Sequence, residues 1–164
     1  MLTILALMLL QQIGMTTRLP VGSILIATEK SHDPDLAQSV ILLIHSDRDG
    51  VMGLILNRPR GKLLYFGGPI ALGVRALVQA HAKPASNDSE GTQRILNGAV
   101  GVYMVSKESS IPKDAMAREY AGYAGWSVQQ LTDEISRGFW KVVPGAAATI
   151  FDPHPETLWQ RMAR

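Results

Sequence analysis

The residues Val40–His45 (VILLIH) and Val51–Leu56 (VMGLIL) are two short apolar runs on either side of the polar stretch Ser46–Gly50 (SDRDG). Runs of this length that are rich in branched side chains and are interrupted by Ser, Asp and Gly are typical of β-strands joined by a turn. The sequence therefore predicts a β-hairpin at this place. A similar run, Gly22–Thr28 (GSILIAT), predicts a further strand before the hairpin.

Three more segments carry local signals. Gln93–Leu96 and Ala99–Val105 flank Asn97-Gly98, a pair that supplies the positive φ angles of a type I′ turn, so a second hairpin is predicted. Asp33-Pro34 has the pattern of a helix start and predicts one or two helical turns. Ala147–Phe151 is expected to pair as a strand near the end of the chain.

The clearest predicted helix runs from Val128 to Arg137. Ser127 and Gln130 have the spacing of a capping box, and Trp126 and Leu131 stand where a hydrophobic staple would close the first turn. A strand is expected to follow, and a last helix is expected to start at Pro155. Hairpins and short helices in irregular order predict the α+β fold class, as one compact domain over residues 15–164.

Composition limits the possible functions. The chain has 164 residues, a hydrophobic content of 46%, a net charge of +2 and no cysteine, so disulfides, thiolate zinc sites and thiol nucleophiles are excluded. Residues 1–14 form an apolar N-terminal extension that is too short to span a bilayer. It is open whether that segment is a dispensable extension with translation starting at Met15, an export signal or a membrane-surface anchor.

Searches for catalytic and metal-binding patterns fail. Gly61-Lys62 lacks the Ser or Thr and the earlier glycine of a phosphate-binding loop, and Asp47-x-Asp49-Gly50 lacks the twelfth-position glutamate of a calcium loop. The four histidines are scattered, with no pair four residues apart. His45 ends an apolar strand and is interpreted as a boundary residue rather than a general base. We expect no cofactor and no metal.

Two turns remain as candidate binding residues. The stretch Asn57–Lys62 is the densest basic region, and its Asn57 and Arg58 could contact an anion or a partner. Gly67, Gly68 and Pro69 could expose backbone amides to a ligand. The alternative interpretation of both segments is structural, as a charged turn and a tight backbone turn.

Taken together, several segments resemble the AlgH/YqgE family over most of the chain from about Val21. These segments are DPDLAQSVILLIH, GVMGLILNRP, GGP, GYAGW, and QLTDEISRGFWKVVP followed by ATIF. The resemblance implies a compact α+β domain with strongly bent, partly barrel-like sheets in the bacterial cytoplasm. It also implies a link to transcriptional regulation without an accepted enzyme activity or DNA-binding motif.

The chain departs from the family pattern at three places. The segment between Pro59 and Gly67 is shorter than is usual in the family, so a surface feature is missing. Ala76 and Gln79 stand where many members have an aromatic residue and a histidine, and Gln129 replaces a common glycine. Gln129 is compatible with a helix, where it is favoured over glycine.

Three functions are compatible with these observations. The leading hypothesis is a non-enzymatic binding or regulatory protein that contacts an unknown protein or small-molecule partner near Asn57, Arg58, Gly67, Gly68 and Pro69. The first alternative is an enzyme that binds a small anionic substrate at the same turns, with His45 or Asp49 handling protons. The second alternative is nucleic-acid binding through the 58–62 loop, although no recognition helix supports direct DNA binding.

Overall fold

The computed structural model describes residues 18–85, 91–106 and 111–164. The predictions about the apolar segment 1–14 concern residues outside these ranges and stay predictions. Nine strands carry most of the fold. They are β1 (Ser23–Ala27), β2 (Val40–Ser46), β3 (Val51–Ile55), β4 (Leu64–Phe66), β5 (Ile70–Ala80), β6 (Thr92–Leu96), β7 (Gly101–Val105), β8 (Met116–Trp126) and β9 (Trp140–Pro144). The helical elements are α2 (Val128–Ser136), α3 (Ala147–Ile150), η3 (Pro155–Thr157), which is a 3₁₀ helix, and α4 (Leu158–Met162).

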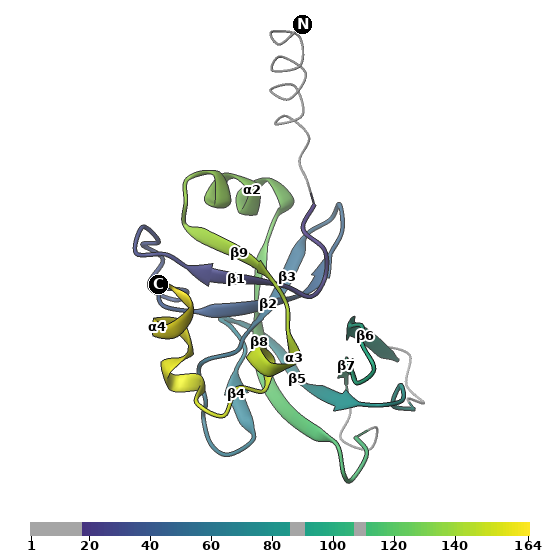
Figure 1. The fold of residues 1–164 in the computed structure, drawn as a ribbon. Helices are drawn as coiled ribbons and strands as arrows, with labels where there is room; N and C mark the ends of the chain where they lie inside the picture. The colour runs from purple at the N-terminus through teal and green to yellow at the C-terminus, as the bar shows by residue number, and fades with distance from the viewer. Residues whose placement is uncertain (1–17, 86–90, 107–110) are drawn as a thin grey trace, which may run out of the picture.

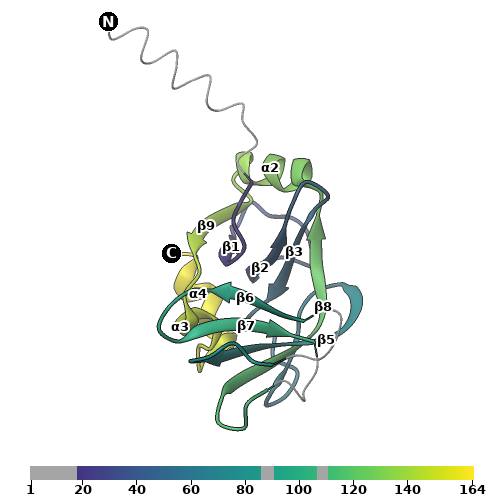
Figure 2. The same ribbon diagram turned by 90° about the vertical axis from the view of Figure 1, so that its right-hand side faces the viewer.

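All nine strands belong to one curled sheet, in the order β6-β7-β5-β8-β3-β2-β1-β9, with β4 joined to β8 beside β3 (Figure 1). Every pairing is antiparallel except that of β4 with β8. The two long strands, β5 and β8, carry the bend between the β1-β2-β3 part and the β5-β6-β7 part, as Figure 2 shows. This half-barrel sheet with three short α-helices confirms the α+β prediction.

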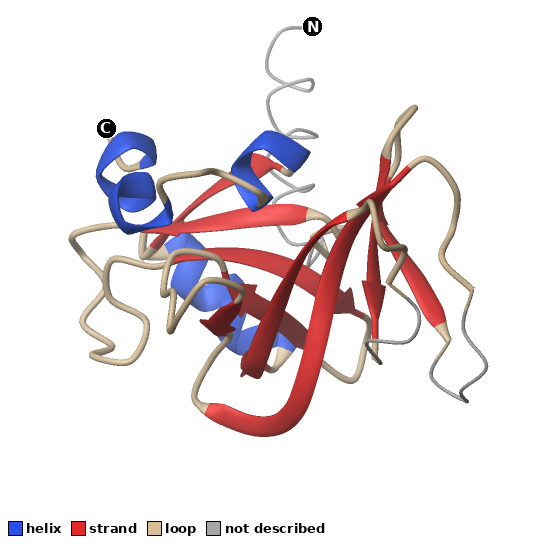
Figure 3. Cartoon of the chain, turned by 90° about the horizontal axis from the view of Figure 1, so that it is seen from below, coloured by secondary structure: helices blue, strands red, loops and turns tan. Residues whose placement is uncertain are grey.

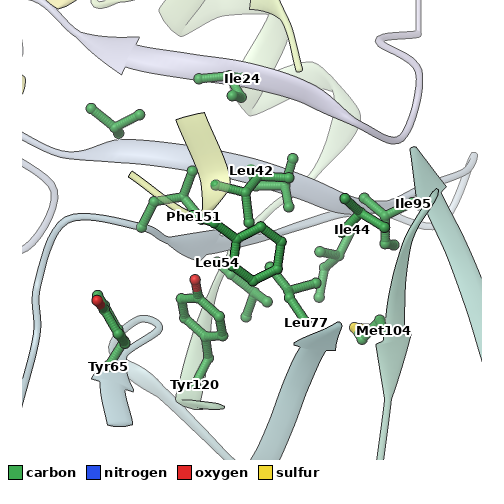
Figure 4. Close-up of a cluster of buried hydrophobic side chains, with 14 of the residues drawn as sticks. Ile24, Leu42, Ile44, Leu54, Tyr65, Leu77, Ile95, Met104, Tyr120 and Phe151 are labelled. Carbon is green, nitrogen blue, oxygen red and sulfur yellow. The ribbon is translucent and has the colours of Figure 1, made fainter. Parts of the chain in front are cut away.

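The curled sheet buries apolar side chains on both faces. Along β1, Ile24 and Ile26 point into the inner core, whereas Leu25 and Ala27 point into a second core on the outer face. The inner core is closed by the C-terminal segment through Ile150, Phe151 and Leu158. Figure 3 shows the helices and strands from below, and Figure 4 shows Phe151 among the inner-core side chains. The outer core is covered by α2. Burial on both faces explains why the strands are continuous apolar runs.

The central strand β8 changes the facing of its side chains at Gly122. Tyr120 and Ala124 are four residues apart and would share one face of a regular strand, yet Tyr120 belongs to the inner core and Ala124 to the outer core. The reason is a bulge, because the register shifts between Ile70 and Val74 of β5, opposite Gly122. Gly122 has a φ of +73°, a conformation that favours glycine.

Helix α2 begins and ends as the sequence predicts, although only one half of the capping box forms, because the Gln130 side chain donates to the Glu134 carboxylate at 3.1 Å. The Ser127 hydroxyl accepts a hydrogen bond from the Gln130 amide at 3.1 Å. Trp126 and Leu131 are both buried in the outer core, where the Trp126 ring meets the Trp140 ring edge-on with centroids 5.8 Å apart. Trp126 and Leu131 therefore form the predicted staple.

Three local predictions are wrong in detail. Asn97 does not have the positive φ that a type I′ turn needs, and Leu96 pairs with Val102, so β6 and β7 are joined by a longer loop. Ala147–Ile150 is a helical turn rather than a strand, although it packs Ile150 into the inner core. The segment after Asp33 forms hydrogen-bonded turns instead of a helix, with the Asp33 carboxylate accepting from the Asp35 amide at 2.8 Å.

Candidate functional site

Asn57 and Arg58 follow β3 and hold the neighbouring loop in place. The Asn57 side chain accepts a hydrogen bond from the Val40 amide and donates one to the Gln38 carbonyl, both at 2.9 Å. The Arg58 guanidinium donates to the carbonyls of Asp35, at 2.6 Å, and Ala37, at 3.1 Å. These two side chains therefore fasten the 33–39 loop to the sheet, which is a structural role.

The loop that they hold has an unusual backbone. Gln38 has a φ of +56°, and it is the one non-glycine residue with positive φ in residues 18–85, 91–106 and 111–164. This left-handed conformation costs roughly 1–2 kcal/mol for a residue with a Cβ. The two Asn57 hydrogen bonds, one to Gln38 itself and one to Val40, offset that cost. Strained backbone conformations of this kind cluster at active sites, ligand-binding sites and switch regions.

A cavity of about 330 Å³ opens beside this strained residue. Its walls come from the loop, from the end of β3 and from the C-terminal helical segment, which α4 brings close although it is distant in sequence. The lining residues are Ala37, Gln38, Asn57, Arg58, Glu156, Trp159 and Gln160. The volume lies at the lower end of the range for small-molecule sites, so the cavity suits a small ligand.

The cavity presents both signs of charge. Burial lowers the pKa of the Arg58 guanidinium, and the nearby Asp35 carboxylate opposes this effect, but an arginine stays charged at neutral pH. Glu156 lies on the wall formed by the C-terminal helical segment. Within the described residues, Glu156 and Arg58 form no ion pair with each other. Trp159 is fixed by its indole N–H, which donates to the Ala27 carbonyl at 2.7 Å. Opposite charges in one cavity can hold both ends of a small polar molecule.

Gly67, Gly68 and Pro69 lie elsewhere, where the chain crosses β8. The Gly67 amide donates to the Ala121 carbonyl at 2.8 Å, and its own carbonyl accepts from the Ile55 amide at 2.9 Å. A Cβ on Gly67 would collide with the Gly122 carbonyl oxygen, and one on Gly68 would collide with the Tyr123 backbone. Backbone packing thus explains both glycines, and the residues that line the cavity do not include them.

The two residues of the enzyme hypothesis are also outside the cavity. His45 stands at the far end of β2 from Val40, and its Nε2 lies 2.9 Å from the Asp47 Oδ2. The Asp49 amide donates to the Asp47 carboxylate, which is the main cause of the lowered pKa of Asp47. Among the described residues no group of three or more His, Cys, Asp and Glu side chains could hold a metal ion.

Sequence reasoning found two of the seven residues of the cavity, Asn57 and Arg58. It missed Gln38, because a left-handed backbone conformation cannot be inferred from a glutamine in a polar loop. It missed Glu156, Trp159 and Gln160, because only the folded chain brings them close to Asn57 and Arg58. The nearest signal was the last helix, predicted to start at Pro155, which contains these three residues.

Comparisons with known proteins agree on one family. The model of the DUF179 family, described as AlgH-like, matches residues 24–164. A UPF0301 protein of Streptomyces coelicolor is 32% identical and aligns over 87% of this chain and 84% of its own length. Another from Methylococcus capsulatus is 31% identical over 85% of this chain and 87% of its own.

Two solved structures share the fold. The crystal structure of a Corynebacterium diphtheriae protein has a TM-score of 0.68 and 25% identity, and covers 87% of this chain and 85% of that chain. The solution structure of the AlgH protein from Pseudomonas aeruginosa has a TM-score of 0.64 and 26% identity, with 87% of both chains covered. At these identities the matches support the same architecture and the same family.

Proposed function

Because the chain belongs to the AlgH-like family of uncharacterised function, we propose that it is a non-enzymatic binding protein with a regulatory role. The proposed site is the cavity between the 33–39 loop, the end of β3 and α4, and the proposed ligand is a small polar molecule. The observation that carries this proposal is the strained Gln38, which Asn57 and Arg58 hold at the cavity wall.

The charges of the cavity define the ligand further. A carboxylate or phosphate would face Arg58, and a donor or ammonium group would face Glu156, while the Trp159 ring would contact the apolar part. A regulatory response would follow if the bound ligand changed the surface formed by the loop and α4. We also propose a location in the bacterial cytoplasm, which the family resemblance supports and with which the lack of cysteine is compatible.

The alternatives have less support. A proton-transferring enzyme would need His45 or Asp49 beside the ligand, and neither residue lines the cavity. A nucleic-acid-binding protein would need a broad basic face, whereas the net charge is only +2. No helix among the described residues is long and apolar enough to cross a membrane.

Calorimetry with a panel of amino acids, nucleotides and dicarboxylates tests the proposal. We expect one class to bind the purified protein and to lose at least tenfold in affinity on Glu156→Gln or Gln160→Ala, which change the cavity wall without removing a fastening of the loop. Gln129→Ala, on the exposed side of α2, is the matched control. A ligand whose affinity is the same in all three variants binds elsewhere and contradicts the proposed site.

A further inference from the structure

Exposed apolar side chains gather on one part of the surface. Of the seven large hydrophobic side chains that are exposed among the described residues, five lie between residues 63 and 74. They are Leu63, Leu64, Ile70, Leu72 and Val74, with exposed fractions of 62%, 37%, 41%, 45% and 48%. A group of exposed apolar side chains that lie close together often marks an interaction site.

The strand registers place much of this set on one face of the sheet. Phe66 of β4 and Val74 of β5 both pair with Ala121 of β8, so the three side chains form a row across three strands. Leu64 pairs with Glu119 and lies on the same face one row further along. The small Ala121 at the centre leaves the row open to solvent.

Neighbouring parts of this outer face are covered. On one side, α2 covers the outer core, to which Phe66 contributes at the edge. On the other side, the loop containing Ile111 and Ala115 covers Ala76, Val78 and Val105. The row from Phe66 to Val74 lies between these two covers. Ile70 lies on the other face, because it pairs with Tyr123, which packs against the inner core. We call the exposed residues Leu63, Leu64, Leu72 and Val74, together with Phe66, the β4–β5 surface.

Positive charge accompanies the β4–β5 surface. Residues 51–87 contain no Asp or Glu but three Arg and two Lys. The tip of the β3–β4 connection carries Arg60 and Lys62 immediately before Leu63, and the Arg60 guanidinium lies 5.3 Å from the centre of the Phe66 ring. The strand registers also place the acidic Glu119 on this face, and Glu119 interacts with another group of the protein.

We propose that the β4–β5 surface docks the protein onto an anionic lipid surface. Leu63 is 62% exposed at the tip of the hairpin between β3 and β4, and Leu72 is 45% exposed where the register of β5 shifts. Protruding leucines can enter the headgroup region of a bilayer, while Arg60 and Lys62 interact with anionic headgroups. The protein lies on the membrane and does not span it.

Co-sedimentation with vesicles tests this proposal in the full chain. One set of vesicles contains phosphatidylglycerol with phosphatidylcholine, and the other contains phosphatidylcholine alone. We expect binding to the anionic vesicles that weakens at least tenfold on Leu63→Asp or Leu72→Asp, and that also weakens on Arg60→Glu combined with Lys62→Glu. A higher salt concentration should also weaken the binding of the wild-type protein to anionic vesicles.

Val142→Asp and Met116→Asp are the matched controls, because they place the same charge at exposed apolar positions outside the surface. Melting curves identify any variant that is unfolded. The proposal fails if wild-type protein does not bind anionic vesicles, or if all four aspartate variants bind equally, which would place the contact in another segment. It also fails if Leu72→Asp converts a dimer into a monomer and leaves vesicle binding unchanged. It fails likewise if Arg60 and Lys62 are needed for tight binding to duplex DNA and not for binding to vesicles. None of these outcomes decides the cavity proposal, because calorimetry with Glu156→Gln and Gln160→Ala tests it without vesicles.

Discussion

Trp126→Ala is expected to destabilise the fold strongly, because the Trp126 ring is buried in the outer core together with Leu131 of α2. Its side chain is 5% exposed, meets Trp140 edge-on and donates its indole N–H to the Glu134 carboxylate at 3.1 Å. Replacing a buried tryptophan by alanine costs about 3–5 kcal/mol. The Glu134 carboxylate keeps its bond from Trp140 at 2.7 Å, so no unpaired charge adds to this cost.

For a domain of this size, a loss of about 3–5 kcal/mol lowers the melting temperature by roughly 10 °C. Differential scanning calorimetry of Trp126→Ala, Trp126→Phe and Gln129→Ala measures the effect. Trp126→Phe keeps most of the ring and should lose only about 1 kcal/mol for the missing hydrogen bond. An unchanged melting temperature in Trp126→Ala would refute the reasoning and would show that the ring contributes to recognition rather than to stability.

Three further predictions concern other parts of the molecule. Asn57→Ala should cost about 2–3 kcal/mol in urea unfolding, because the Val40 amide and the Gln38 carbonyl both lose their partner. A hydrogen bond from Arg161 lowers the pKa of Asp152. The pair therefore stabilises the fold above pH about 4, and this contribution is lost as the pH falls further. Asp152→Asn should remove that part of the acid dependence of the melting temperature. Fluorescence anisotropy with unrelated duplex DNA should show no binding tighter than about 10⁻⁵ M at physiological salt.

The sheet was predictable from sequence wherever local patterns decide it. The runs that became β1, β2 and β3 are apolar throughout because both of their faces are buried, and α2 is fixed by its own cap and staple. The order of the strands was not predictable, since the pairing of β8 with β3, β4 and β5 depends on contacts between distant residues. Ala147–Phe151 was misassigned because a short apolar run fits a buried helical turn as well as a strand.

The candidate site was predictable only in part, and for a physical reason. Asn57 and Arg58 were singled out as charged and polar turn residues, and the structure shows that their hydrogen bonds go to a loop about twenty residues away. Whether they also bind a ligand stays a prediction. The glycines at 67 and 68 were singled out for their exposed amides, whereas close backbone packing against β8 requires them.

The β4–β5 surface depends on the crossing of the chain over β8. Because Gly67 and Gly68 let the chain pass close to Gly122, β4 and β5 can lie on opposite edges of one strand, which places Phe66 and Val74 in one exposed row. The Arg58 guanidinium, which bonds to the carbonyls of the 33–39 loop, lies 6.0 Å from the centre of the Phe66 ring. Arg58 thus contacts the cavity on one side and the β4–β5 surface on the other. A ligand that drew Arg58 away from the loop carbonyls would therefore alter the surroundings of Phe66, and by linkage an occupied β4–β5 surface would alter the affinity of the cavity by the same factor.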